Sequence, residues 1–142
     1  MSARIVRLGT RRVRSEGMRI GTVRRPPRGV PRSRFAKGDW YDVWFPTLAP
    51  SAQAVKSALA STTPAEWRRF TKRYRSEMSQ PEPKHALELL AALSHATNFS
   101  VSCYCEDESR CHRSILRQLL VENGARVEPT RAQPTRARKH AR

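Results

Sequence analysis

The sequence predicts an α/β fold: one small domain in which helices pack on a small mixed sheet. Short stretches that are β-branched, or that alternate apolar with polar residues, are followed along the chain by amphipathic helical stretches. A strand–helix–strand unit is expected near the C-terminus. The chain has 142 residues, the usual length of one domain, and such a domain buries roughly two thirds of its unfolded surface. The domain, which includes a basic N-terminal segment, is expected to span residues 1–128. A basic disordered tail is expected over residues 129–142.

Three strands are expected in the first third of the chain. Residues 5–8 are short and β-branched, and residues 18–23 alternate apolar with polar side chains. The prolines of residues 24–31 remove donors and fix φ, so that segment is expected to form a rigid, arginine-rich turn. Residues 41–45 then supply a third, short strand.

Helices are expected in the middle of the chain. Ser51 is a candidate cap for a helix that runs to about residue 60. The run Thr63-Pro-Ala-Glu66 is a capping box with proline at the first helical position, which predicts a second helix start. The side chains that follow at helical spacing are predicted to face the core: Trp67, Phe70, Tyr74 and Met78.

Residues 79–83 are expected to break this helix, and the next helix is expected from residue 84 to about residue 96. Its inward-facing side chains are predicted to be Leu87, Leu90 and Leu93.

The last third predicts a strand, a loop and a helix. Residues 99–105 read as a strand that places Cys103 and Cys105 on one face. A helix is expected to begin at Arg110 or Cys111, and residues 126–128 are expected to add an edge strand. The apolar stripe of that helix is predicted to be Ile115, Leu116, Leu119 and Leu120.

The positive charge lies at the two ends of the chain. Of the net charge of +16, residues 1–38 carry +11 (12 Lys/Arg, one acid) and residues 129–142 carry +5 (five Lys/Arg, no acid). Residues 39–128 are neutral, with 11 basic and 11 acidic side chains. Because clustered arginine attracts polyanions, a non-specific nucleic-acid partner is one expectation for these ends.

No membrane partner and no cofactor are expected. The sequence has no apolar run of about 20 residues and no apolar core of a secretion signal at its N-terminus. Its three cysteines, two of them one residue apart, make a poor disulfide framework. We therefore expect a cytoplasmic protein with reduced thiols. The oligomeric state does not follow from the sequence.

The stretch from Cys103 to Arg113 is the best candidate site. At a helix start the backbone N–H groups of Cys111, His112 and Arg113 are unpaired, and the helix dipole adds positive charge. Such a start favours a small anionic or phosphate-bearing ligand and lowers the pKa of a cysteine thiol. Three nearby carboxylates compete for the same position or pair with Arg24, Arg25 or Arg28; they belong to Glu106, Asp107 and Glu108.

Three other interpretations of this stretch stay open. In the first, Cys105 or Cys111 is a nucleophile and His112 transfers protons. In the second, a zinc ion is held by Cys103, Cys105, Cys111 and His112. Against zinc, the spacing lacks the usual pairs, Cys103 faces the core, and neighbouring helical residues point about 100° apart. In the third, these residues only fasten the loop to the helix.

Four segments resemble the bacterial domain of unknown function 488 family, in its YeaO-like branch. The most distinctive is Cys103-x-Cys-Glu-Asp-x3-Cys-His-Arg113. The others are residues 19–29, residues 40–51, and Phe70-x3-Tyr-x2-Glu-Met78. Where the family usually has an aromatic residue before Pro-Arg-Gly, this chain has Pro26.

The resemblance implies an α/β fold with a pocket where the Pro-Arg-Gly turn meets the Cys-His-Arg helix start, and it implies no reaction. The residues that correspond to the family's recurrent polar positions are Arg25, Arg28, Cys105, Glu106, His112 and Arg113. From residues and resemblance together, we expect any catalysis to involve Cys105, Cys111, His112 and Glu106. Anion binding is expected from Arg25, Arg28 and Arg113, and no residue is assigned to a metal.

Overall fold

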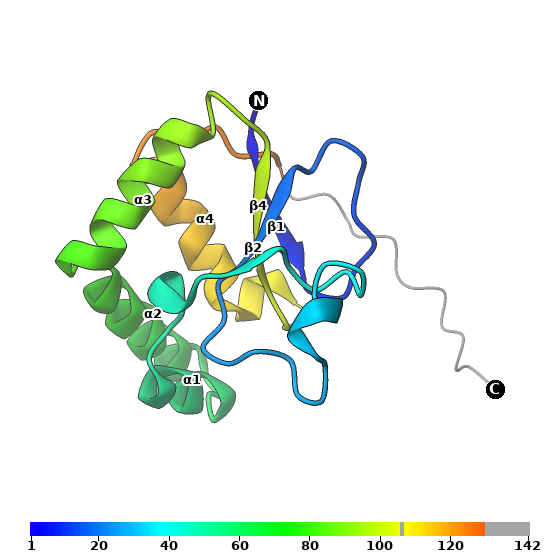
Figure 1. The fold of residues 1–142 in the computed structure, drawn as a ribbon. Coiled ribbons are helices and arrows are strands. Elements are labelled where there is room, and N and C mark those ends of the chain that lie inside the picture. The colour runs from blue at the N-terminus through cyan, green and yellow to red at the C-terminus, as the bar shows by residue number, and fades with distance from the viewer. Residues whose placement is uncertain (106, 130–142) are drawn as a thin grey trace.

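The computed structural model describes residues 1–105 and 107–129. Its sheet has four strands in the order β1-β4-β2-β3, with the bounds Ala3–Arg7, Phe99–Cys103, Met18–Gly21 and Val43–Trp44. The α/β class is confirmed. The sheet was expected to be mixed, but every pairing among these strands is parallel. Figure 1 shows the four α-helices grouped on one side of the strands.

Strand β4 is the centre of the sheet. It pairs with β1 from Ala3↔Phe99 to Arg7↔Cys103 and with β2 from Met18↔Phe99 to Gly21↔Ser102. The edge strand expected over residues 126–128 is reduced to one isolated bridge, between Ala3 and Val127. The carboxyl ends of β1, β4 and β2 therefore lie side by side at one edge of the sheet.

The helices begin where their capping signals predict. Helix α1 spans Ala52–Leu59 and α2 spans Pro64–Met78. The Ser51 hydroxyl accepts a hydrogen bond from the Ala54 N–H, and the Thr63 hydroxyl accepts one from the Glu66 N–H. These caps satisfy N–H groups that a helix start leaves unpaired.

Helix α3 begins earlier than expected, since it spans Pro81–Leu93 and contains the prolines that were expected to interrupt it. The first turn of a helix has no intrahelical acceptors for its N–H groups, so Pro81 and Pro83 cost no hydrogen bond there. The inward position predicted for Leu93 is wrong, because this side chain is 38% exposed at the end of the helix.

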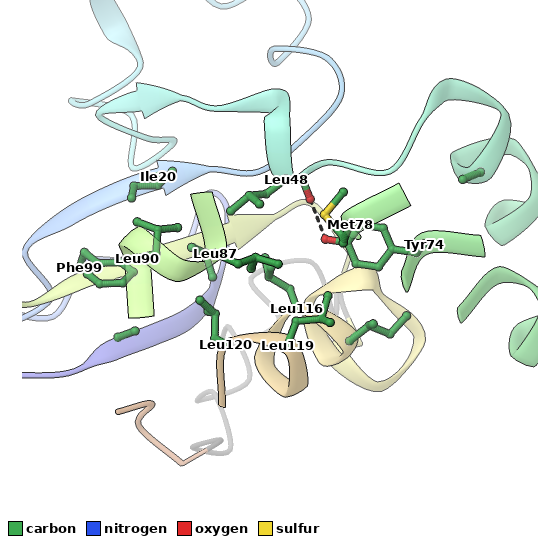
Figure 2. Close-up of a cluster of buried hydrophobic side chains, with 14 of the residues drawn as sticks. Ile20, Leu48, Tyr74, Met78, Leu87, Leu90, Phe99, Leu116, Leu119 and Leu120 are labelled. Atoms are coloured by element: carbon green, nitrogen blue, oxygen red, sulfur yellow. Dashed lines mark hydrogen bonds between the residues drawn. The ribbon is translucent and has the colours of Figure 1, made fainter. Parts of the chain in front are cut away.

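The main core lies between the sheet and the helices. Figure 2 shows side chains of α3 and α4, a helix that spans His112–Glu122, close to Ile20 and Phe99 of the sheet. The Tyr74 hydroxyl donates a hydrogen bond of 2.6 Å to the Leu48 carbonyl, so this buried polar group is satisfied. Of the aromatic stripe on α2, Phe70, Tyr74 and Met78 are buried and Trp67 is half-buried.

A second, smaller apolar cluster lies at the carboxyl edge of the sheet. Its buried members are Leu8, Val23, Tyr41, Cys103 and Cys111. Among the residues that the structure describes, no helix is long and apolar enough to cross a membrane. The tail expected over residues 129–142 lies, apart from Pro129, outside the described residues.

Candidate functional site

The candidate site lies where β2 and β4 end and α4 begins. The Thr22 N–H, just after β2, donates a hydrogen bond of 3.0 Å to the Ser102 carbonyl, which holds the two strand ends together. Cys103 is the last residue of β4, and Cys111 caps α4 after a short 3-10 turn over Glu108–Arg110. Ligands of parallel α/β sheets bind at this edge, in front of the helix N-termini.

Four sulfur- and nitrogen-bearing side chains, Cys103, Cys105, Cys111 and His112, converge there; we call them the Cys/His cluster. The Sγ atoms of Cys103 and Cys105 are 3.8 Å apart. The Sγ atom of Cys111 is 3.8 Å from Nδ1 of His112. The donor atoms of Cys103, Cys111 and His112 all lie within 4.8 Å of one another, and the three thiols are free.

The backbone at Cys111 explains how two neighbouring residues reach one point. Cys111 has extended dihedral angles, φ −128° and ψ 151°, and only His112 starts the helix. The 100° separation expected between adjacent side chains holds for two helical residues and does not apply to a residue in the cap. The helix start expected at Arg110 or Cys111 is one or two residues too early, and this convergence was not foreseen from the sequence.

Burial separates the members of the cluster. Cys111 is 1% exposed and His112 is 6% exposed, whereas Cys105 is half-buried. The Cys103 side chain is also buried, as the sequence predicts for a strand cysteine facing the core. Cys105 is therefore the thiol with most access to solvent.

His112 is held in one orientation. Its Nε2 atom lies 2.9 Å from the Thr22 carbonyl oxygen, and its ring meets the Tyr74 ring edge-on, with centroids 5.5 Å apart. A carbonyl oxygen only accepts hydrogen bonds, so Nε2 carries a proton. The Nδ1 atom therefore faces the Cys111 sulfur.

The three thiols share their protons unequally. The hydrogen bond with Cys105 is the largest of the effects that raise the pKa of Cys103, and burial adds to it. The hydrogen bond from Cys103 is the largest of the effects that hold the pKa of Cys105 well below its usual range, and the nearby Arg113 guanidinium contributes. The hydrogen bond from Cys103 also lowers the pKa of Cys111. The cluster thus favours thiolate at Cys105 and Cys111.

The charged residues expected around the helix start have other partners. Arg113 is buried, and its Nη2 donates a hydrogen bond to the Cys105 carbonyl. Glu108 pairs with Arg117, with 2.9 Å between Oε1 and Nη2. The Asp107 carboxylate accepts hydrogen bonds from Ser109. Glu106, a predicted catalytic residue, lies outside the described residues.

A pocket of about 590 Å³ opens beside the cluster; we call it the arginine–aromatic groove. Its lining comes from the turn after β2 and from two aromatic residues: Arg25, Pro26, Pro27, Arg28, Trp40 and Tyr104. Tyr104 stands between Cys103 and Cys105 in the chain, so the groove and the cluster share one segment.

The groove contains two of the three predicted anion-binding residues. Its aromatic wall, formed by Trp40 and Tyr104, was not predicted from the sequence. Arg25 and Arg28 line the groove, whereas Arg113 and His112 do not. The arginine-rich turn thus forms the pocket with Tyr104. The resemblance implied that the turn would form it with the start of the Cys-His-Arg helix. Trp40 was not singled out from the sequence. In the structure its ring packs closely over Gly38, where a Cβ would lie 2.9 Å from the ring.

Comparison with known proteins places the chain in a family. Residues 3–124 match the family model described as the active DUF488-N3 subclade. No curated protein and no solved structure matches the chain.

Proposed function

The chain belongs to the DUF488 family, whose name assigns no reaction, and from the geometry of its groove we propose that it binds a small phosphate-bearing ligand with a planar ring. The observation that carries this proposal is the pairing of two arginines with two aromatic side chains in one pocket. The volume of the groove, about 590 Å³, suits a small ligand.

The arginines supply the anion-binding half of the groove. Arg25 and Arg28 are exposed, and two prolines between them restrict the backbone. Arg24 anchors the same turn, because its guanidinium donates hydrogen bonds to the carbonyls of Ala49 and Pro50. A guanidinium binds phosphate oxygens in pairs, and a rigid turn loses little entropy on binding.

The aromatic residues supply the other half. The rings of Trp40 and Tyr104 meet edge-on, with centroids 6.1 Å apart. The Tyr104 hydroxyl donates a hydrogen bond of 3.0 Å to the Arg25 carbonyl, so the aromatic wall and the turn are tied together. Aromatic faces stack with planar rings regardless of their substituents, which favours a nucleotide over a phosphate without a ring.

The catalytic roles predicted for Cys105, Cys111, His112 and Glu106 are not part of this proposal and stay predictions. No cysteine, histidine or carboxylate among the described residues lines the groove. The buried position of Cys111 and His112 argues against direct contact with a ligand in the groove.

Calorimetric titration with inorganic phosphate, ribose 5-phosphate and adenosine monophosphate tests the proposal. We expect the double variant Arg25→Ala/Arg28→Ala to bind the nucleotide at least about tenfold more weakly, because each charge-assisted hydrogen bond contributes about 1.5–3 kcal/mol. The nucleotide is expected to bind more tightly than ribose 5-phosphate.

The matched control is Arg68→Ala/Arg69→Ala, which removes the same charge from two exposed arginines of α2 outside the groove. The proposal is wrong if the parent protein binds none of the three probes. It is equally wrong if the two double variants lose the same affinity, since the loss would then reflect net charge.

Nucleic acid is the second candidate partner, and the observation that favours it is the exposed basic surface of residues 1–38. The exposed cationic side chains there are Arg11, Arg14, Arg25, Arg28, Arg32, Arg34 and Lys37. A polynucleotide partner predicts affinity that falls with salt, with a log–log slope near 0.9 per phosphate contact on duplex DNA. A mononucleotide in the groove predicts a much smaller slope.

A further inference from the structure

We propose that Cys103, Cys105, Cys111 and His112 bind one zinc ion. The donors come from the end of β4, the segment after it, and the start of α4. The donor atoms of three of them lie within 4.8 Å of one another, and Cys105 joins through its 3.8 Å contact with Cys103. The proposal of this metal site does not rest on the ligand proposed for the groove.

Two of the six donor–donor distances match those of tetrahedral zinc. With Zn–S bonds of about 2.3 Å and Zn–N bonds of about 2.0–2.1 Å, the edges of the tetrahedron are about 3.8 Å between sulfurs and about 3.6 Å between sulfur and nitrogen. The observed distances are 3.8 Å for Cys103 Sγ to Cys105 Sγ and 3.8 Å for Cys111 Sγ to His112 Nδ1. Cys105 is not in the group of donors that lie within 4.8 Å of one another, so its thiol must move towards Cys111 and His112 to complete the tetrahedron around the metal.

The histidine has the support that a metal ligand requires. Metal-binding imidazoles donate their second ring N–H to a carbonyl or carboxylate, which fixes the tautomer. Here the Thr22 carbonyl, 2.9 Å from Nε2, has that role. Nδ1 is thereby left on the side of the thiols, and its lone pair binds the metal once any proton on it is released.

The surroundings offset the charge of the bound site. Three thiolates, one neutral imidazole and Zn²⁺ sum to one negative charge. The buried Arg113 guanidinium donates to the Cys105 carbonyl, and the positive end of the α4 dipole lies at Cys111 and His112. Soft thiolate and imidazole donors in a tetrahedral set select zinc over the oxygen-preferring Mg²⁺ and Ca²⁺.

A zinc ion at this position fastens the segment that carries Tyr104. Both neighbours of Tyr104 in the chain, Cys103 and Cys105, are ligands in the proposed site, so the ion fixes one wall of the arginine–aromatic groove. Each ligand thiol loses its proton on binding, and these protons go to solvent.

The test measures metal content and the cobalt spectrum of the purified full chain. We expect about one equivalent of zinc per chain after dialysis, and strong thiolate-to-cobalt charge-transfer bands with tetrahedral d–d bands after exchange for Co²⁺. We expect Cys111→Ser and His112→Ala to lose at least about 90% of the bound metal, since each removes a ligand from a closed site. His85→Ala, at an exposed position on α3, is the matched control and should keep it.

Two results would overturn the proposal. One is a parent protein that keeps no metal after zinc is added and shows three thiols reactive toward a disulfide reagent in the native state. The other is a cobalt spectrum typical of octahedral oxygen ligands. Both are measured on the parent protein, so a variant that fails to fold does not decide the outcome, and neither depends on whether the groove binds a nucleotide.

Discussion

Replacing Glu16 by alanine is expected to lower the free energy of unfolding by about 3–5 kcal/mol, because it leaves a buried guanidinium without its counter-charge. Glu16 is 2% exposed and Arg19 is 0% exposed, and their side chains form two hydrogen bonds of 2.7 and 2.9 Å. The Glu16 carboxylate also accepts a hydrogen bond from Ser100 on β4, so the loss disconnects β4 from the loop before β2. Chemical denaturation measures the effect.

The control is the exposed ion pair between Arg75 and Glu122, whose nitrogen and oxygen are 3.0 Å apart. Glu122→Ala should change the free energy of unfolding by less than about 1 kcal/mol, because solvent screens that pair. Equal effects of the two substitutions would contradict the buried network.

The pH dependence of the Glu16 effect has a definite sign. Burial alone would raise the pKa of Glu16, but the hydrogen bonds and charge of Arg19 outweigh it and the pKa is lowered from 4.5. A carboxyl group whose pKa is lower in the folded state stabilises the fold above its unfolded pKa. The parent protein and Glu16→Ala should therefore differ most in their free energy of unfolding above about pH 5. This difference should shrink as the pH falls through the folded-state pKa of Glu16.

Leu116→Ala is expected to destabilise the protein by about 2–5 kcal/mol, because a fully buried leucine leaves a cavity that its neighbours fill only in part. Leu116 is 0% exposed on α4 and lies in the cluster drawn in Figure 2. The control is Leu89→Ala on α3, where the side chain is 60% exposed and little change is expected. A small change in the denaturation midpoint of Leu116→Ala would mean that α4 does not pack as the structure has it.

Local signals predicted the elements that depend on neighbouring residues. The capping residues Ser51 and Thr63 mark the starts of α1 and α2, and the apolar spacing of α4 predicts the face that is buried. The error at α3 has a local cause too, because Pro81 and Pro83 were taken as a break although they occupy the first turn, where proline fits.

Features that join distant parts of the chain were not predictable. Glu16 was counted only as the one acid in a basic segment, whereas its charge is matched inside the fold by Arg19. Nothing in the sequence near Trp40 indicates that it faces Tyr104, 64 positions away along the chain. Such contacts depend on the order of strands in the sheet, which a periodic pattern does not encode.

The sequence singled out the stretch proposed as the site, but not the way in which its side chains meet. The stretch from Cys103 to Arg113 was recognised, and two of its cysteines with His112 do meet. Helical geometry at Cys111 would keep its side chain apart from that of His112, but the backbone of Cys111 is extended, so the two side chains meet. The zinc alternative, left open from the sequence, is the one that these distances favour.

Quenching of tryptophan fluorescence by adenosine monophosphate tests most directly whether the groove binds a ring-bearing phosphate. Trp40 lines the groove, whereas Trp67 packs against Phe70 on α2, with ring centroids 4.9 Å apart. We expect saturable quenching in the parent protein that is lost in Trp40→Phe and kept in Trp67→Phe. Quenching that survives in Trp40→Phe, or none in the parent protein, would contradict the groove as the ligand site.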